Sequence, residues 1–262
     1  MGAMRIAALG LLAALAGCAA PPPPVGLGTK EVREIVALSD APWRSVGAVV
    51  TAAGARCTGA VIGPRTVLTA AHCVLDPGTA RPLDAGAIVF VLGLSPDRPG
   101  VRLGVASYAL GPGFMAQPGP RPDPVAPPDA DWAVLSLDPA APGLPPDLAL
   151  PLAPGFVRPG VRVALGGYQA DRPTTLVADL GCTTLGYGRD AAGRTMLRHS
   201  CSATGGSSGG PLLLQLPDRS WVVAGVGSMA VRGQAGGWAV PAATIRRMEG
   251  EMKGTYTARP AR

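Results

Sequence analysis

Apolar and polar residues alternate in short runs along most of the chain, and this pattern predicts β-strands rather than helices. The runs are rich in Val, Leu, Ile and Thr, and Gly and Pro residues separate them. The expected strands fall into two sets, residues 46–50, 59–62, 66–69, 88–92, 101–108 and 132–137, then residues 161–166, 175–182, 196–201, 211–216, 221–227 and 237–240. Two sets of about six strands predict an all-β fold of two packed, six-stranded antiparallel β-barrels.

Proline-rich and helical segments divide the rest of the chain. A proline-rich crossing separates the two sets of strands, and another segment rich in Pro and Gly predicts an exposed loop. After the last strand, Ile245 and Met248 lie one helical turn apart, which predicts a C-terminal helix that docks through them. The expected divisions are a domain over residues 43–252 with lobes at about 43–138 and 159–241, a crossing at 138–159, a loop at 111–129, a helix at 242–252 and a tail at 253–262.

The N-terminus has the layout of an export signal. Arg5 precedes an unbroken apolar run over residues 6–16, which is too short to span a bilayer. The sequence Leu-Ala-Gly-Cys at residues 15–18 resembles the lipobox of bacterial lipoprotein signals, whose cysteine becomes the acylated first residue. We expect residues 1–17 to be a signal peptide and Cys18 to be lipidated, with a plain cleaved signal as the alternative. The Pro-rich residues 18–42 are then expected to be a spacer that lifts the folded domain off a membrane, in the periplasm or cell envelope.

Composition favours a folded protein with a substantial core. Of the 262 residues, 47% are hydrophobic and 15% are charged, and the mean hydropathy is +0.27. The net charge of +6 and the pI of about 9.4 come from scattered arginines, and only 4% of the residues are aromatic. We therefore expect no nucleic-acid partner, and no membrane contact other than the lipid anchor.

Cysteine usage agrees with an oxidising compartment. Without Cys18 the chain has four cysteines, which allow three pairings. We favour disulfides Cys57–Cys73 and Cys182–Cys201, because each pair brackets a segment of hairpin size and closes a short loop. A metal site is the alternative for four cysteines, but no CxxC or CxxH spacing is present, so we expect neither a metal nor a cofactor.

The segment TGGSSGGP at residues 204–211 places two serines among four glycines. Such clusters are usually flexible linkers, but this one lies inside the strand-rich region and borders no change in composition. It therefore predicts an ordered turn shaped around a serine hydroxyl. The chain has two histidines that could serve as its base. We favour His72, because it adjoins Cys73 of a predicted disulfide that would hold its backbone, and we expect a structural role for His199.

Three blocks of the sequence resemble the catalytic blocks of the trypsin/chymotrypsin-like serine peptidases. They are CTGAVIGPRTVLTAAHCV at residues 57–74, DWAVLSL at 131–137 and GGSSGGPLL at 205–213, and they occur in the order His, Asp, Ser. The segment from Cys182 that ends CSATGGSSGGP is similar to the bacterial secreted branch that also holds the glutamyl-specific V8-type enzymes. The resemblance covers roughly residues 43–248, and it implies a trypsin-like fold and a peptidase with its site between the lobes.

The resemblance also implies a role for individual residues. Ser208 matches the nucleophile, His72 its general base, and Asp131 the carboxylate that orients the histidine. Asp123 and Asp129 lie near Asp131 but are expected to be solvated, because Asp131 directly precedes a strand. The backbone N–H groups of Gly206 and Ser208 are expected to form an oxyanion hole.

Departures from the family pattern bear on activation and specificity. Trypsin and its relatives have an acidic residue before the nucleophile, which pairs with a newly freed N-terminus, but here Ser207 takes that position. We expect a site that is competent from the start or is activated by another route. The resemblance places Ser202 and Ala203 at the base and wall of the specificity pocket, and Gly227, Ser228 and Met229 on its substrate-pairing strand. Without an Asp at the trypsin-type position or a His at Gly227, the pocket predicts an uncharged side chain of small or medium size.

The sequence therefore predicts a monomeric serine endopeptidase that acts on polypeptides in the bacterial cell envelope. The alternative is an inactive homologue that kept the fold as an envelope binding module, although such proteins usually lack one residue of the triad. An esterase that uses the same triad is a further alternative.

Overall fold

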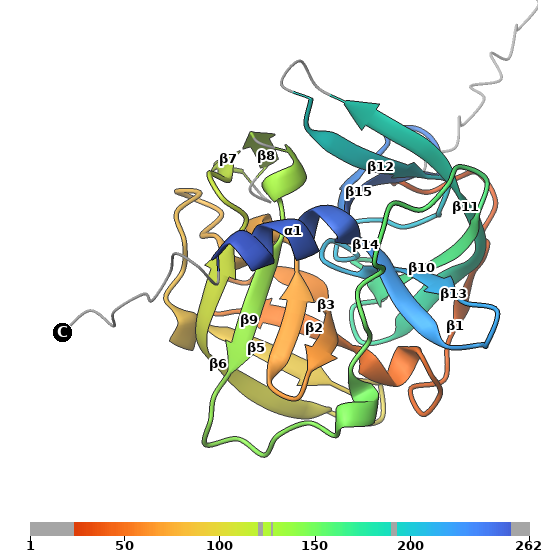
Figure 1. Ribbon diagram of the computed structural model, residues 1–262. Helices are drawn as coiled ribbons and strands as arrows, with labels where there is room; N and C mark the ends of the chain where they lie inside the picture. Colours follow the sequence, from red (N-terminus) through yellow and green to blue (C-terminus); the bar gives the residue numbers. More distant parts are fainter. Residues whose placement is uncertain (1–23, 120–122, 127, 190–192, 253–262) are drawn as a thin grey trace, which may run out of the picture.

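The computed structural model describes residues 24–119, 123–126, 128–189 and 193–252. These residues form two β-barrels that lie side by side, and the helix α1 (Ala242–Met252) crosses in front of them in Figure 1. Helix α1 packs against β14 and β15 of the second barrel, with Ile245 fully buried. The predicted helix is thereby confirmed, with the same bounds.

The first barrel is a closed ring of six antiparallel strands in the order β2-β3-β4-β9-β6-β5. The strands are β2 (Val46–Thr51), β3 (Arg56–Gly63), β4 (Thr66–Thr69), β5 (Ile88–Leu92), β6 (Val101–Leu110) and β9 (Ala133–Leu137). Each of them overlaps one of the first six predicted segments. The alternation that predicted them is seen in β9, where Ala133, Leu135 and Leu137 are buried and Ser136 between them is exposed.

The second barrel is built from β10 (Arg162–Tyr168), β11 (Leu176–Arg189), β12 (Thr195–His199), β13 (Pro211–Gln215), β14 (Trp221–Ala230) and β15 (Gly237–Pro241). Its sheet runs in the order β11-β10-β13-β14-β15-β12, and β11 also pairs with β12, which closes the ring. The expected all-β fold of two six-stranded barrels is thereby confirmed. The site described below lies where the two barrels meet.

A strand that the sequence did not predict, β1 (Arg33–Ile35), pairs with the outer edge of β11. Its inward position holds Arg33, which is 6% exposed, whereas Ile35 is 71% exposed. This reversal of the usual apolar pattern explains why the strand was missed. Between residues 26 and 36 this segment is hydrogen-bonded to the second barrel, although the sequence assigned it to the spacer 18–42. Residues 18–23, which include Cys18, lie outside the described residues.

The predicted loop over residues 111–129 contains a small hairpin instead. Strands β7 (Met115–Gln117) and β8 (Asp123–Ala126) pair antiparallel as a separate two-stranded sheet. The strands are short and one of them contains a proline, so neither shows the alternation by which longer strands are recognised.

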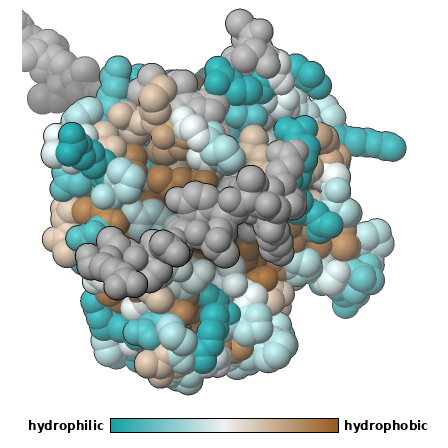
Figure 2. All heavy atoms as spheres, turned by 60° about the vertical axis from the view of Figure 1, so that its left-hand side comes forward, coloured by the Kyte–Doolittle hydropathy of each residue, from teal (hydrophilic) through white to brown (hydrophobic). Residues whose placement is uncertain are grey.

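Both predicted disulfides are present. Cys57 on β3 is bonded to Cys73, which lies just beyond β4, and Cys182 on β11 is bonded to Cys201, which lies just beyond β12. Each bond therefore closes a local loop, as the spacing of the cysteines predicted. Within the described residues, no helix combines the length and the apolar character that crossing a bilayer requires. Figure 2 shows hydrophilic and apolar residues interspersed over one face of the molecule.

Candidate active site

His72 and Asp131 are brought together by two paired strands. His72 lies in a short 3₁₀ helix, η2 (Ala71–Val74), which follows β4, and Asp131 lies two residues before β9. Strands β4 and β9 pair with Thr69 opposite Ala133, so the end of β4 and the start of β9 lie side by side at the same end of the first barrel. The Nδ1 atom of His72 lies 2.9 Å from Asp131 Oδ2 and 3.1 Å from Oδ1. The backbone N–H of His72 also donates to Oδ1 at 3.0 Å.

Asp131 is held as a carboxylate in a fully buried position. Burial alone would raise the pKa of this group, but the neighbouring His72 and the hydrogen bonds from His72 and Ser228 outweigh it and hold the pKa below its usual value. The hydroxyl of Ser228 donates to Asp131 Oδ2 at 2.5 Å. The sequence placed Ser228 on the substrate-pairing strand, and this contact with Asp131 was not predicted.

The disulfide beside His72 restrains the loop that carries it. The sulfur atoms of Cys57 and Cys73 and a ring nitrogen of His72 all lie within 4.8 Å of one another. Because Cys57 belongs to β3, the bond ties the residue after His72 to the neighbouring strand. Both sulfurs are used in this bond, so they do not act as thiolate ligands for a metal.

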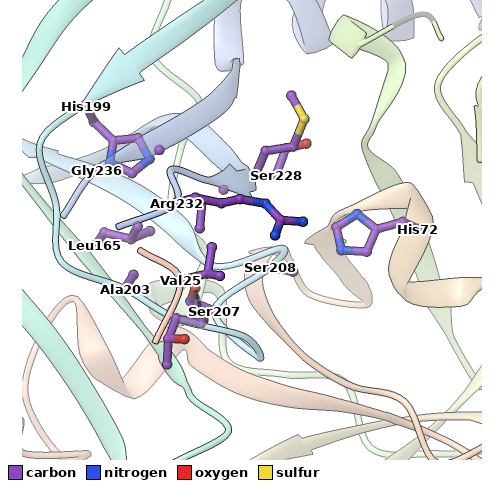
Figure 3. A pocket seen from close by; sticks show the side chains of 15 residues that line it. Val25, His72, Leu165, His199, Ala203, Ser207, Ser208, Ser228, Arg232 and Gly236 are labelled. Atoms are coloured by element: carbon purple, nitrogen blue, oxygen red, sulfur yellow. Dashed lines mark hydrogen bonds between the residues drawn. The ribbon is translucent and has the colours of Figure 1, made fainter. Parts of the chain in front are cut away.

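Ser208 lies in a tight turn that is pressed against the first barrel. Gly209, with φ of +79°, has no room for a side chain, because a Cβ there would lie 2.1 Å from Thr69 Oγ1 and 2.3 Å from the carbonyl oxygen of Thr58. The carbonyl oxygen of Ser208 accepts a hydrogen bond from Thr58 N–H at 2.8 Å. These contacts place Ser208 in the same pocket as His72 (Figure 3). The two side chains are not hydrogen-bonded to each other here.

The backbone around Ser208 leaves two N–H groups available. The carbonyl oxygens of Gly205, Gly206 and Ser207 accept bonds from Ala170 N, Thr58 Oγ1 and Gly210 N, at 2.6, 2.8 and 2.8 Å. All three carbonyls are therefore turned toward protein donors. Among the residues that the structure describes, no acceptor binds the N–H of Gly206 or of Ser208.

Most of the predicted specificity residues line this pocket. Ala203, Gly227, Ser228 and Met229 do so, as expected. Ser202 is not among its lining residues: it is buried, and its backbone N–H donates to Asp179 Oδ2 at 2.8 Å. Its place at the base of the pocket stays a prediction.

Val25 and Arg232, which sequence reasoning did not single out, also line the pocket, as does His199, for which a structural role was expected. His199 Nδ1 accepts from Cys201 N–H at 3.2 Å, so in the neutral ring the proton is on Nε2. Burial lowers the pKa of His199 to about 4, which keeps the ring neutral at pH 7. Figure 3 shows the guanidinium of Arg232 directed toward His72, with His199 at the other side of the pocket. A buried, neutral ring bonded to the backbone is compatible with the structural role that the sequence predicted for His199.

Two barrels with a histidine, a carboxylate and a serine gathered where they meet define a peptidase-like site. The trypsin-like peptidase domain matches residues 57–226, and the chain belongs to this family. The structure is similar to that of a Glu endopeptidase in complex with MPD, with a TM-score of 0.66 and 18% sequence identity over 87% of this chain and 100% of that chain. No curated protein matches the sequence. The expected trypsin-like family and fold are confirmed, and both support a peptidase.

Proposed function

We propose that this protein is a serine endopeptidase in which Ser208 is the nucleophile, His72 the general base and Asp131 the orienting carboxylate. The observation that carries the proposal is the 2.9 Å contact between His72 Nδ1 and the buried Asp131, in the pocket that also contains Ser208. Contact with an ionised Asp131 keeps the proton of the neutral ring on Nδ1, so Nε2 remains free to accept one. That is the tautomer that a base for Ser208 requires.

The proposed reaction proceeds by acyl transfer. As Ser208 Oγ attacks the carbonyl carbon of the scissile peptide bond, its proton passes to His72 Nε2, and a tetrahedral intermediate forms. The intermediate collapses when the C–N bond breaks and His72 gives the proton to the leaving amine. Water, activated by His72, then hydrolyses the acyl-enzyme and restores the Ser208 hydroxyl. The hydrogen bond between Ser208 and His72 is expected to form when substrate closes the site, as catalytic hydrogen bonds often do.

The N–H groups of Gly206 and Ser208 are the proposed oxyanion hole. They have no protein acceptor within the described chain, whereas the surrounding carbonyls are turned toward other donors. Negative charge that develops on the substrate oxygen would be stabilised by both groups. Loss of one such donor typically costs about 2.7 to 4 kcal/mol of transition-state stabilisation.

The residues that line the pocket favour some substrate side chains over others. None of its described lining residues is acidic, which disfavours Lys and Arg side chains in the substrate. Leu165, Ala203 and Met229 supply apolar lining, which supports the predicted preference for an uncharged side chain of small or medium size. The cation of Arg232 and the Nε2–H of His199 favour an acidic side chain as the alternative. The similar solved structure is that of a Glu endopeptidase.

The proposed setting is the bacterial cell envelope, with polypeptides as substrates and a monomeric enzyme. Two disulfides support an oxidising compartment. The proposed signal peptide and the acylation of Cys18 rest on the sequence alone, because both lie outside the described residues. Intact-mass measurement of the exported protein tests them, since it shows both the first residue and any acyl chains.

Labelling with a fluorophosphonate probe tests the catalytic proposal. The probe is expected to modify the wild-type chain and Ser136→Ala, an exposed serine on β9, and to leave Ser208→Ala unmodified. His72→Ala is expected to slow the labelling strongly. A well-folded wild type that takes no label would favour the inactive binding module instead. Comparing peptide and ester substrates then separates an endopeptidase from an esterase.

A further inference from the structure

The residues before the first barrel form an N-terminal arm, residues 24–35, that runs along the second barrel and contacts the loop leading to Ser208. The arm makes contact at two points. One is a backbone pairing at Gly26, and the other is a side-chain relay from Arg33. Neither contact is explained by the triad, and no motif in the sequence indicated either of them.

At the first point, Gly26 joins two walls of the pocket. Its N–H donates to the carbonyl oxygen of Val231 at 2.9 Å, and its carbonyl oxygen accepts from Ala203 N–H at 3.0 Å. Gly26 has a φ of +83°, and a Cβ there would lie 2.0 Å from the carbonyl oxygen of Ala203. The arm therefore lies directly against the pocket, and its neighbour Val25 contributes to the lining.

At the second point, Arg33 reaches the same loop through one buried amide. Its Nη1 donates to Gln169 Oε1 at 2.7 Å, and the same oxygen accepts from Thr204 N–H at 2.8 Å. Gln169 is completely buried and Arg33 is 6% exposed, so water does not compete for these bonds. Arg33 is held in turn by Glu31 Oε2 at 2.6 Å and Asp171 Oδ2 at 2.7 Å.

Thr204 passes this restraint to the turn around Ser208. Its carbonyl oxygen accepts from Ser207 N–H at 3.1 Å and from Ser207 Oγ at 2.6 Å. In addition, Ala170, the residue after Gln169, donates its N–H to the carbonyl oxygen of Gly205 at 2.6 Å. The segment 169–170 thus fixes both residues that precede Gly206, and so determines where the Gly206 N–H points.

We propose that Arg33 is a positioning residue, which holds the Thr204–Ser208 turn in its competent form through Gln169 while the N-terminal arm remains uncut. This inference rests on the proposed function, because competence here means a turn shaped for the nucleophile and the oxyanion hole. It accounts for the uncharged Ser207, whose hydroxyl binds the turn itself and leaves the anchoring to Arg33. In this chain the charged residue that anchors the turn is Arg33, which lies in the N-terminal arm rather than directly before the nucleophile.

The matched pair Arg33→Met and Arg172→Met in the full chain tests this inference. Arg172 contacts the same Glu31, at 3.5 Å, and its side chain is 36% exposed and has no bond to Gln169. Arg172 is bonded to Gln169 through its backbone N–H, which donates to the Gln169 carbonyl oxygen at 2.9 Å, and the substitution keeps this bond. Arg33→Met is expected to lower kcat and the rate of fluorophosphonate labelling roughly tenfold relative to Arg172→Met, with a smaller change in KM. Amide hydrogen exchange at Thr204 is expected to accelerate in Arg33→Met alone. Arg33→Lys, which keeps the cation but has its N–H donors on a single nitrogen, is expected to recover part of the rate.

Equal labelling rates and equal exchange at Thr204 in the two variants would overturn the inference. If Arg33→Met fails to fold, Asp171→Asn serves in its place, because it loosens Arg33 without emptying the buried position. It is expected to show the same changes on a smaller scale, and wild-type rates in it would count against the relay. A folded wild-type protein that is not labelled at Ser208 would contradict the proposed function. In that case the exchange at Thr204 still decides whether Arg33 holds the turn.

Discussion

Thr58 on the first barrel is hydrogen-bonded to Ser208 on the second, through the donation of its N–H to the Ser208 carbonyl oxygen at 2.8 Å. The hydroxyl of Thr58 makes two more contacts across the same junction. It donates to the carbonyl oxygen of Gly206 at 2.8 Å and accepts from Tyr168 N–H at 2.9 Å. One threonine therefore sets the distance between the barrel that carries His72 and the turn that carries Ser208.

Replacing Thr58 by valine is expected to destabilise the protein on the order of 3 kcal/mol, because it keeps the shape of the side chain but leaves a buried carbonyl and a buried N–H without partners. Activity of the folded variant is expected to fall as well. Urea unfolding measures the first effect, and Thr79→Val, in an exposed loop, is the control. Equal unfolding midpoints for the two variants would contradict the assignment.

Gly209→Ala is expected to cost roughly 3 kcal/mol or more, because the added methyl group meets Thr69 Oγ1 and the backbone of Thr58. Gly54→Ala is the matched control. Gly54 also has a positive φ, of +84°, but nothing lies within 4 Å of its Cβ position, so the expected cost is about 1 kcal/mol of backbone strain. Thermal unfolding of both variants gives the comparison. Similar losses of stability in the two variants would show that the residues around Gly209 move to accommodate the methyl group, and would contradict the prediction.

Stability is expected to fall as the pH is lowered from about 6.5 to about 4, because of His199. Burial lowers its pKa from 6.5 to about 4, so in this window the unfolded chain binds a proton that the folded chain does not. The full effect is on the order of 3 kcal/mol. Urea unfolding across this pH range measures it, and His199→Gln is expected to flatten the slope. If stability depends on pH just as strongly in His199→Gln, the pH dependence comes from other groups and the prediction is wrong.

A second fall in stability is expected below that range, from Glu31. The hydrogen bond and charge of Arg33 lower the pKa of Glu31 from 4.5 to about 2, so its contribution is present above pH 4.5 and is lost as the pH falls toward 2. Glu31→Gln is expected to reduce this dependence, to which Asp131 and Asp171 also contribute through their lowered pKa values, and to leave the step between pH 6.5 and 4 intact. The two steps can therefore be separated in one series of urea titrations. A Glu31→Gln variant that keeps the low-pH slope would refute the assignment.

Removing either disulfide is expected to cost about 3 kcal/mol, because each closes a loop of similar length, with 16 and 19 residues of separation. The kinetic effects are expected to differ. Replacing Cys57 and Cys73 by alanine frees the loop of His72 and lowers kcat, whereas replacing Cys182 and Cys201 disturbs the pocket wall and raises KM. Steady-state kinetics on a peptide substrate distinguish the two, and the same effect from both pairs would contradict this division.

Much of the fold could be predicted because its strands have one face in a core. All twelve barrel strands produce runs of apolar residues that a reader of the sequence can locate. Strand β1 broke this rule, since its buried residue is Arg33. The hairpin β7–β8 was too short and too interrupted by proline to show any period.

Residues of the candidate site could be predicted only where they belong to a short sequence motif. His72, Asp131 and Ser208 lie in recognisable blocks, and the cysteine spacing indicated both disulfides. The contact between Arg33 and Gln169 spans 136 residues, and no local pattern records it. The place of His199 beside the pocket could not be predicted for a related reason, because only the closure of the barrel through β11 and β12 brings it there.

The turn at Ser208 is seated on Thr58 and Thr69, so it takes its shape only once both barrels have docked. For the peptidase proposed above, this has a consequence during maturation. A chain whose barrels have not yet docked would carry Ser208, His72 and Asp131 without their alignment, and it is therefore expected to leave neighbouring proteins intact until it has folded.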